Sequence, residues 1–396
     1  MGEGRAVGKT NRFFAAPFAA ICALTLLLAA CAGGEGPAPA IVQTPGVPLP
    51  TEERVIGDGN VTVAMLLPLS AGGSASNLAQ SFQNAADLAL AEVNPDNVRI
   101  LVLDTGGETD KARLAAEAAI AGGAQLILGP VFAPAVTGAG TAARAANVPM
   151  VAFSTDASVT GRGVYLLSFL PRQDATRIAR YAGEQGLRAF AGLVPDNGYG
   201  LVMEAAFREA VAASGGRVTA IERYASGEIG AAAGRLASRG AFEAVFVPNG
   251  GDDPTAAAAA LRAQGINARL LGSGQWDNPA VWSGEGLAGA WFPAPQKGGF
   301  EAFSQRYQAK YSGTPPRTAS LVYDAALLAN GLAGIQGGGA YRPATLEGRD
   351  GYVGVDGVFR LTGNGLSERG LAVYEIKLGG STELISPAPK SFGRSF

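Results

Sequence analysis

Short apolar runs alternate with longer amphipathic ones from residue 61 onward. The run 61–67 holds six apolar residues and one threonine, which is typical of a strand buried on both faces. Residues 77–93 place Leu78, Phe82 and Ala85 on one stripe at helical spacing and therefore predict a helix. This alternation predicts a parallel sheet whose two faces are covered by helices.

The same pattern predicts the elements that follow. The further expected strands are 98–104, 126–128, 148–152, 189–194, 218–224, 244–247 and 269–271, and the further expected helices are 110–121, 133–145, 174–185 and 201–213. Asp110 or Thr109 is expected to cap the helix 110–121. Because the pattern pauses around 164–171 and then restarts, we expect two α/β lobes of about equal size.

The C-terminal part follows a different pattern. Residues 358–361 and 372–377 are strand-like, and Gly363-Asn364-Gly365 lies between them. We therefore expect these two segments to form an antiparallel pair joined by a turn.

The N-terminus predicts secretion and lipidation. A basic segment is followed by the uncharged residues 13–30, which is typical of a signal peptide. Leu28-Ala29-Ala30-Cys31 resembles the bacterial lipobox, which implies cleavage before Cys31 and acylation of its sulfur. A membrane-spanning anchor is the alternative, but Pro17 and the small residues before the cysteine favour a signal peptide over 1–30. Residues 31–60 contain five prolines and predict a tether.

Composition narrows the class of protein. Without the signal peptide, 28 basic residues face 32 acidic ones, so we expect no nucleic-acid partner. Histidine is absent, and Cys22 leaves with the signal while Cys31 is lipidated. Histidine-based catalysis, histidine-containing metal sites and thiol chemistry are therefore excluded. We expect no enzyme, no catalytic residue, no metal and no cofactor.

Several motifs together resemble the Leu/Ile/Val-binding (type I) family of periplasmic binding proteins, across nearly all of 61–396. They are Met65-Leu66-Leu67-Pro68-Leu69-Ser70, Leu103-Asp104-Thr105, Gly129-Pro130, residues 148–154, Asp196-Asn197-Gly198-Tyr199-Gly200, Tyr323-Asp324-Ala325 and residues 354–359. The resemblance implies two Rossmann-like lobes joined by three crossovers. Lobe 1 would be 61–170 plus 296–336, and lobe 2 would be 171–295 plus 337–396. A ligand would bind between the lobes at the carboxyl ends of the strands.

Some segments are most similar to lipoproteins that activate penicillin-binding proteins, the peptidoglycan synthases. They are residues 164–171, 272–277, 287–292 and 368–375. Those activators carry a helical-repeat region before this domain, whereas only the tether precedes it here.

The resemblance also implies ligand-binding residues in lobe 1. Ser154 and Thr155 follow a strand where family members bind a ligand carboxylate, although they could instead cap the next turn. Ser70 ends the first strand in the corresponding way. Phe132 could line the cleft, and so could Phe153, although an aromatic residue beside a strand is more often part of the core.

In lobe 2 the resemblance places an acidic partner for a ligand ammonium near 274–277, where Gln275 is neutral and Asp277 is acidic. Asp196 and Tyr199 are a second candidate pair, in a segment that could also be a simple turn. Asn249 completes the candidate set. Trp276, Trp282 and Trp291 are either an exposed anchor for a partner or part of the core.

Two functions fit this sequence. The first is an activator of a penicillin-binding protein, held on the periplasmic side of the outer membrane because alanine, not aspartate, follows Cys31. The alternative is the receptor of an ABC permease for amino acids or a similar small polar ligand.

Overall fold

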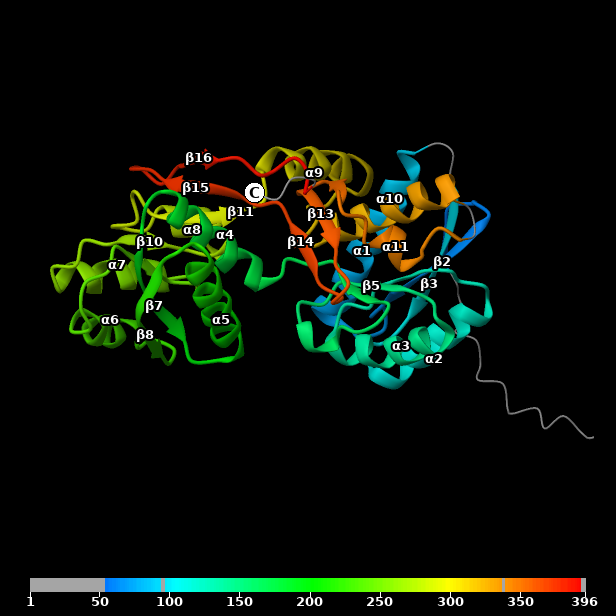
Figure 1. Ribbon diagram of the computed structural model, residues 1–396. Helices are drawn as coiled ribbons and strands as arrows, with labels where there is room; N and C mark the ends of the chain where they lie inside the picture. Colours follow the sequence, from blue (N-terminus) through cyan, green and yellow to red (C-terminus); the bar gives the residue numbers. More distant parts are fainter. Residues whose placement is uncertain (1–53, 94–96, 337–338, 393–396) are drawn as a thin grey trace, which may run out of the picture. The chain divides into compact units, whose positions relative to one another are not determined.

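The computed structural model describes residues 54–93, 97–336 and 339–392. The signal peptide, Cys31 and residues 32–53 of the expected tether therefore lie outside the described residues. Within the described part, the expected architecture of two α/β lobes is confirmed, with one large sheet in each lobe and a small third sheet beside that of lobe 1 (Figure 1). None of the described helices is long and apolar enough to span a membrane.

Lobe 1 is built on a six-stranded sheet of order β1-β3-β2-β4-β5-β6. Its strands are β1 (Arg54–Ile56), β2 (Val61–Leu67), β3 (Val98–Asp104), β4 (Ile127–Leu128), β5 (Met150–Ala152) and β6 (Val164–Leu166). Neighbouring strands are parallel except β1, which runs antiparallel to β3. Residues 54–56, expected to be tether, are thus part of the folded sheet.

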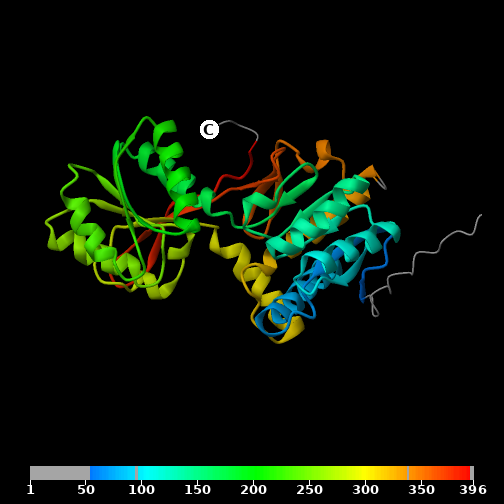
Figure 2. The ribbon, with the colours of Figure 1, turned by 90° about the horizontal axis from the view of Figure 1, so that it is seen from below.

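Helices cover both faces of this sheet (Figures 1 and 2). They are α1 (Gly73–Ala91), α2 (Thr109–Ala121), α3 (Ala133–Ala146), α9 (Lys297–Tyr311), α10 (Ala319–Gln336) and α11 (Pro343–Leu346), with the short turn η1 (Ala157–Val159). Side chains of β2 alternate between the faces: Met65 packs in the core under α1 and α10, and Leu66 packs in the core under α2 and α3. The side chains of β2 therefore contribute to the cores on both faces of the sheet, which is why its sequence is a continuous apolar run.

Lobe 2 is built on a seven-stranded sheet of order β16-β15-β11-β10-β9-β7-β8. Its strands are β7 (Ala189–Pro195), β8 (Arg217–Tyr224), β9 (Ala244–Phe246), β10 (Arg269–Leu271), β11 (Trp291–Ala294), β15 (Ala372–Ile376) and β16 (Thr382–Ser386). The first five are parallel, whereas β15 and β16 pair antiparallel at one side. Its helices are α4 (Pro171–Glu184), α5 (Gly198–Ala213), α6 (Ile229–Ala237), α7 (Asp253–Ala263) and α8 (Pro279–Trp282), with the short turn η2 (Gly274–Trp276).

A third sheet corrects the prediction for the C-terminal part. It consists of β12 (Tyr352–Gly354), β13 (Gly357–Leu361) and β14 (Ser367–Arg369), all antiparallel. The expected partner of 358–361 was 372–377, but the turn is tight and β13 pairs with β14 instead. Segment 372–377 pairs with β11 in lobe 2 as β15.

The chain passes between the two lobes three times. The crossings lie between β6 and α4, between β11 and α9, and between β14 and β15. The third crossing follows Arg369, because Phe359 and Leu361 of β13 are part of the lobe 1 core. It therefore lies later than the expected boundary at 337.

Helix starts differ from the sequence prediction by a few residues. The N-cap of α2 is Glu108, without a side-chain hydrogen bond, so neither Asp110 nor Thr109 caps it. Helix α4 begins at Pro171, since proline at the first position already has helical φ and needs no N–H partner.

Candidate functional site

Lobe 1 brings Ser70, Phe132 and Ser154 to the carboxyl edge of its sheet, because β2, β4 and β5 are parallel neighbours. Ser154 is buried, and its hydroxyl oxygen accepts the Asp156 N–H at 3.2 Å. Its own O–H proton remains able to donate to a ligand. The neighbouring Thr155 is exposed.

Phe132 lies at the rim of this edge and is 37% exposed. Its ring packs over Gly107, where an added Cβ would lie 3.1 Å from Cδ2 of the ring. Phe153 is different: it packs edge-to-face on Phe82 within the core of lobe 1, with ring centroids 5.6 Å apart. Only Phe132 can therefore offer its ring to a ligand.

The carboxylate of Asp104 is hydrogen-bonded to the loop that carries Ser70. Its Oδ1 accepts the main-chain N–H groups of Ser70 at 3.0 Å and Gly106 at 2.9 Å. Burial opposes the charge, but hydrogen bonds from Ser70 and Gly106 hold the pKa of the carboxyl below its ordinary value. A carboxylate therefore lies beside Ser70, a residue that the resemblance had grouped with those that bind a ligand carboxylate.

Lobe 2 builds a polar cluster at the corresponding edge. The Tyr199 hydroxyl lies 3.0 Å from the Pro248 carbonyl oxygen and 3.2 Å from the Ser273 hydroxyl. Ser273 is fully buried and donates to the same carbonyl at 2.6 Å. Burial raises the pKa of Tyr199, so the phenol stays protonated.

Asn249 and Gln275 belong to this cluster. The Gln275 side chain accepts the Gly250 N–H at 3.0 Å, and the Asn249 amide donates to Asp253 at 2.8 Å. The indole of Trp276, fully buried, donates to the Asn249 carbonyl at 2.9 Å. Trp276 is therefore a core residue that holds the η2 turn in place.

Asp196 lies apart from the cluster. It is exposed, and its main-chain N–H donates to Tyr224 at the end of β8. The following Asn197 accepts the Gly200 N–H and caps α5. Asp196 and Asn197 therefore form the simple turn that was the alternative to a ligand-binding role. Tyr199 from the same segment lies in the polar cluster.

Asp174 is the residue that sequence reasoning missed. It lies in the first turn of α4, mostly buried, and its Oδ2 accepts the Gly274 N–H of η2 at 2.9 Å. Burial raises the pKa of this carboxyl to about 7, and that single hydrogen bond only partly offsets the effect. No described cation pairs with it. The sequence gives no signal for this role, because an acidic residue in a first helical turn usually serves the helix itself.

Asp277 lies instead beside the second crossing between the lobes, the one from β11 to α9. Its carboxylate is 3.6 Å from Lys297 and 3.9 Å from Arg317. Burial raises its pKa although both cations oppose the shift. Lys297 also stacks on Trp282, with Nζ 3.9 Å from the ring centroid, so Asp277 is part of a structural network.

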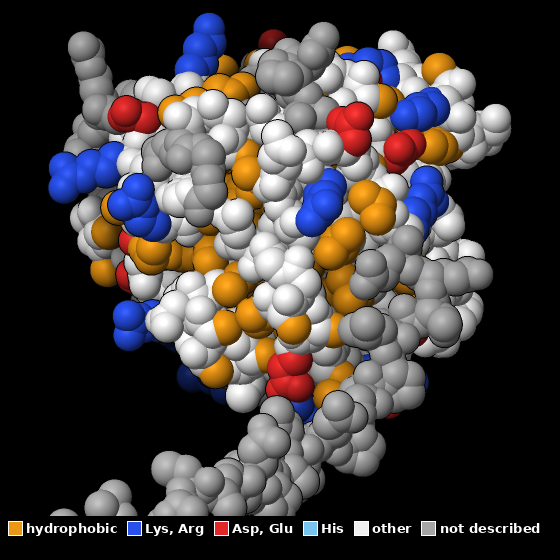
Figure 3. Space-filling view, turned by 90° about the vertical axis from the view of Figure 1, so that its right-hand side faces the viewer, with side chains coloured by type: hydrophobic (Ala, Val, Ile, Leu, Met, Phe, Trp, Pro, Cys, Tyr) orange, Lys and Arg blue, Asp and Glu red, His pale blue; other side chains and the backbone are white. Residues whose placement is uncertain are grey.

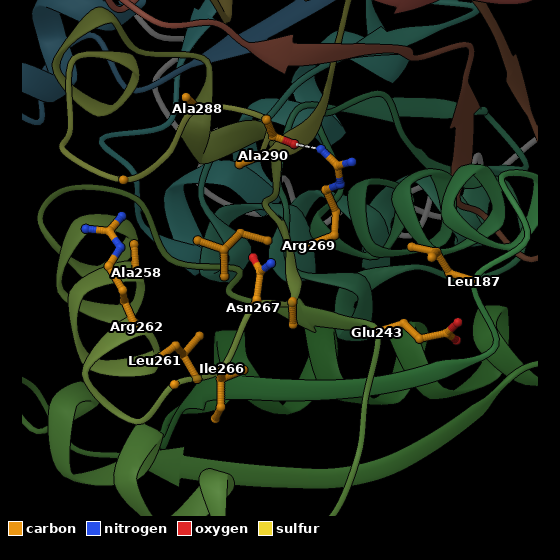
Figure 4. Close-up of a pocket in the computed structure, with 15 residues that line it drawn as sticks. Leu187, Glu243, Ala258, Leu261, Arg262, Ile266, Asn267, Arg269, Ala288 and Ala290 are labelled. Atoms are coloured by element: carbon orange, nitrogen blue, oxygen red, sulfur yellow. Dashed lines mark hydrogen bonds between the residues drawn. The ribbon is translucent and has the colours of Figure 1, made fainter.

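A pocket in the described surface lies elsewhere, at the amino ends of β9, β10 and β11 in lobe 2. Its volume is about 650 Å³, and Arg262 and Arg269 border it on opposite sides with Asn267 between them (Figure 4). Arg269 donates to the Gly289 carbonyl. This pocket lies at the opposite edge of the sheet from Tyr199, Ser273 and Asp174, and is not the candidate site.

Basic side chains do not gather on the face shown in Figure 3. Lys and Arg are scattered there among apolar and acidic side chains.

Comparison with known proteins decides the family. The family model described as "Periplasmic binding protein" matches residues 60–380. The chain belongs to this family. The expected resemblance to the type I periplasmic binding proteins is thereby confirmed.

Solved periplasmic binding proteins share the fold. A candidate branched-chain amino acid ABC transporter from Rhodospirillum rubrum superimposes with a TM-score of 0.72 at 22% identity, covering 82% of this chain and 99% of that one. The branched-chain amino acid substrate-binding protein LivJ from Streptococcus pneumoniae, solved with isoleucine, gives 0.55 at 20% identity, covering 83% and 99%.

A curated periplasmic relative is similar over part of its length. The Leu/Ile/Val-binding protein homolog 6 of Brucella abortus is 30% identical over 168 residues, which is 40% of this chain. The match spans 42% of that relative. The names of these relatives refer to branched-chain amino acids or their transport, and none refers to the activator function that was expected first.

Proposed function

We propose that this periplasmic binding protein is the solute receptor of an ABC transporter and that its solute carries a cationic nitrogen, as amino acids do. The relatives support the receptor function in preference to activation of a penicillin-binding protein. The observation that carries the choice of solute is Asp174, a mostly buried carboxylate without a cationic partner among the described residues.

Electrostatics favours a cation as the partner of the Asp174 carboxylate. A buried carboxylate without a counter-charge is costly, and its raised pKa is the measure of that cost. An ammonium group beside Asp174 would compensate the charge and hydrogen-bond its free oxygen. Asp104 in lobe 1 adds negative charge, which disfavours a purely anionic solute.

The rest of an amino acid would find complementary groups. In lobe 1 the Ser154 hydroxyl can donate to a carboxylate, and the Phe132 ring can cover an apolar side chain. Tyr199, Gln275 and Asn249 in lobe 2 are polar groups that can fix orientation. These roles are binding roles, without chemistry on the solute.

A thermal-shift screen of the purified full chain tests the proposal. We expect amino acids to raise the melting temperature, whereas benzoate and uncharged amides should not. At a hundredfold excess over Kd, a ligand stabilises the folded state by about 2.7 kcal/mol. A shift with benzoate and none with any amine would contradict the proposed solute class. Co-purification of a peptidoglycan synthase without any solute shift would restore the activator function.

We further propose that the protein is a lipoprotein anchored through Cys31, with its folded part on the periplasmic side of the membrane. The lipobox-like segment 28–31 supports the anchor. Ala32 favours the outer membrane, a location that goes with the activator function and not with delivery of a solute to a permease. Acyl chains contribute about 0.8 kcal/mol per buried methylene. We therefore expect Cys31→Ala to move the protein from the membrane fraction to the soluble periplasm. A Cys22→Ala variant is the matched control, and retention of Cys31→Ala in membranes would refute the anchor.

A further inference from the structure

Asn249 of lobe 2 is held in place at three points. Its main-chain carbonyl accepts the indole N–H of the fully buried Trp276 at 2.9 Å. The next residue, Gly250, donates its N–H to Oε1 of Gln275 at 3.0 Å. The Asn249 side chain donates from Nδ2 to Oδ2 of Asp253, in the first turn of α7, at 2.8 Å. The loop between β9 and α7 is therefore fixed against η2 and against the start of its own helix.

Asp253 determines which end of the Asn249 amide faces it. A carboxylate only accepts hydrogen bonds, so it must meet the NH2 group of the amide and not its carbonyl oxygen. The same carboxylate oxygen also accepts the Tyr224 hydroxyl at 2.6 Å. Tyr224 is 3% exposed, and burial raises its pKa, so the hydroxyl keeps the proton that it donates. The Asn249 amide therefore cannot turn over without placing two acceptors against each other.

The carbonyl end of this amide is left for another partner. No hydrogen bond within the described part of the chain uses Oδ1 of Asn249. The oxygen is not enclosed by protein, and Asn249 is half-buried, so a solute can reach it. An oxygen that is fixed in place and can only accept is suited to binding an N–H donor.

The short turn η2 connects Asn249 with Asp174. Gly274, at the start of this turn, donates to the Asp174 carboxylate at 2.9 Å, and Trp276, at its end, donates to Asn249. Both residues therefore border the same three-residue turn. A solute ammonium has several N–H groups, and one carboxylate oxygen satisfies only one of them.

We propose that Oδ1 of Asn249 accepts a second N–H of the solute's ammonium group, and that Asp253 is the positioning residue that turns this oxygen toward the solute. This role rests on the proposed solute class, because it needs a nitrogen with more than one N–H. Without Asp253 the amide can turn over and present its own NH2 group, which cannot accept a hydrogen bond from an ammonium. Asp253 itself does not touch the solute.

A double-mutant cycle measured by isothermal titration of the full chain tests this role. The probe is the standard amino acid that gives the largest shift in the thermal-shift screen. We expect Asn249→Ala and Asp253→Leu each to weaken its binding about tenfold, as for one lost hydrogen bond to a charged group. Because Asp253 acts through Asn249, the double variant should bind no more weakly than Asn249→Ala alone. Asp252→Leu, which removes the neighbouring exposed carboxylate, is the matched control and should bind as the wild type does.

A merely structural role of Asp253 would give a different cycle. If Asp253 only stabilised α7 and Tyr224, the two losses in affinity would multiply to about 100-fold in the double variant. That result, or wild-type affinity in Asp253→Leu, would overturn the role of Asp253 and leave the solute class standing. If no standard amino acid bound the wild type, the solute class and this role would fail together.

Asp253→Asn replaces Asp253→Leu in the cycle if the latter does not fold. It keeps an acceptor for the Tyr224 hydroxyl but lets the Asn249 amide turn over, since an amide can meet either end of another amide. Its loss in affinity should be smaller than tenfold and should disappear when Asn249 is already alanine. A loss that persists beside Asn249→Ala would count against the proposed role.

Discussion

Asp174→Asn is expected to weaken the binding of an amine-bearing solute by roughly 100-fold, because removing one member of a buried ion pair costs about 3 kcal/mol. The amide can still accept the Gly274 N–H, so the η2 turn keeps its contact with α4. Isothermal titration with the amino acid found in the screen measures the loss.

A matched control is Asp252→Asn, which alters an exposed carboxylate beside α7 in the same lobe. Its side chain caps nothing, so affinity should stay unchanged. An Asp174→Asn protein that binds amines as well as the wild type would refute the role of Asp174.

The pH dependence of the same group has a definite sign. The pKa of Asp174 is raised from 3.8 to about 7 by burial, so between these values the folded protein holds a proton that the unfolded chain has lost. Stability contributed by this group is therefore lost as pH rises from about 4 to 7. Amine binding needs the carboxylate, so affinity should fall as pH drops below about 7. In Asp174→Asn both dependences should shrink, although Asp324, with a pKa also near 7, keeps part of the first.

Trp276→Ala is expected to lower the free energy of unfolding by about 3–5 kcal/mol, the usual cost of truncating a buried aromatic residue. Trp276 is fully buried, and Trp282 donates to its carbonyl at 2.6 Å. Even a Cβ on Gly272 would lie 2.2 Å from its ring, which shows how closely the backbone approaches it. Urea unfolding measures the effect.

Trp276→Phe serves as the comparison. It keeps a ring in the core but loses the hydrogen bond to Asn249, so we expect a smaller cost of about 1–3 kcal/mol. Equal costs for the two variants would mean that the hydrogen bond, not the packing, holds the turn. A cost below about 1 kcal/mol for Trp276→Ala would contradict its place in the core.

Sequence periodicity predicted the central strands well, because most of them are buried on both faces. The run 61–67 became β2 with every residue buried, and 269–271 became β10. The pairing of 358–361 was not predictable, since strand-like residues at 372–377 looked like a better partner than the short, polar 367–369.

Site residues were harder to predict than strands. Ser154, Tyr199 and Gln275 follow or flank strand ends, where a parallel sheet gathers them. Asp174 could not be recognised, because a carboxylate in a first helical turn usually serves the helix itself. Asp174 packs against Gly274, which lies 100 positions further along the chain and donates its N–H to the carboxylate. Asp277 lies in the segment that the resemblance indicated, but its carboxylate faces Lys297 and Arg317, which belong to lobe 1.

Strand β1 has a practical consequence for handling this protein. Its three residues pair antiparallel with Ile100, Leu101 and Val102 and so cover part of the outer side of β3. A shortened protein beginning at residue 61 would leave those N–H and C=O groups unpaired on an apolar edge strand. Such edges recruit strands from other molecules, and the result is aggregation. A soluble form for crystallisation should therefore begin before Arg54.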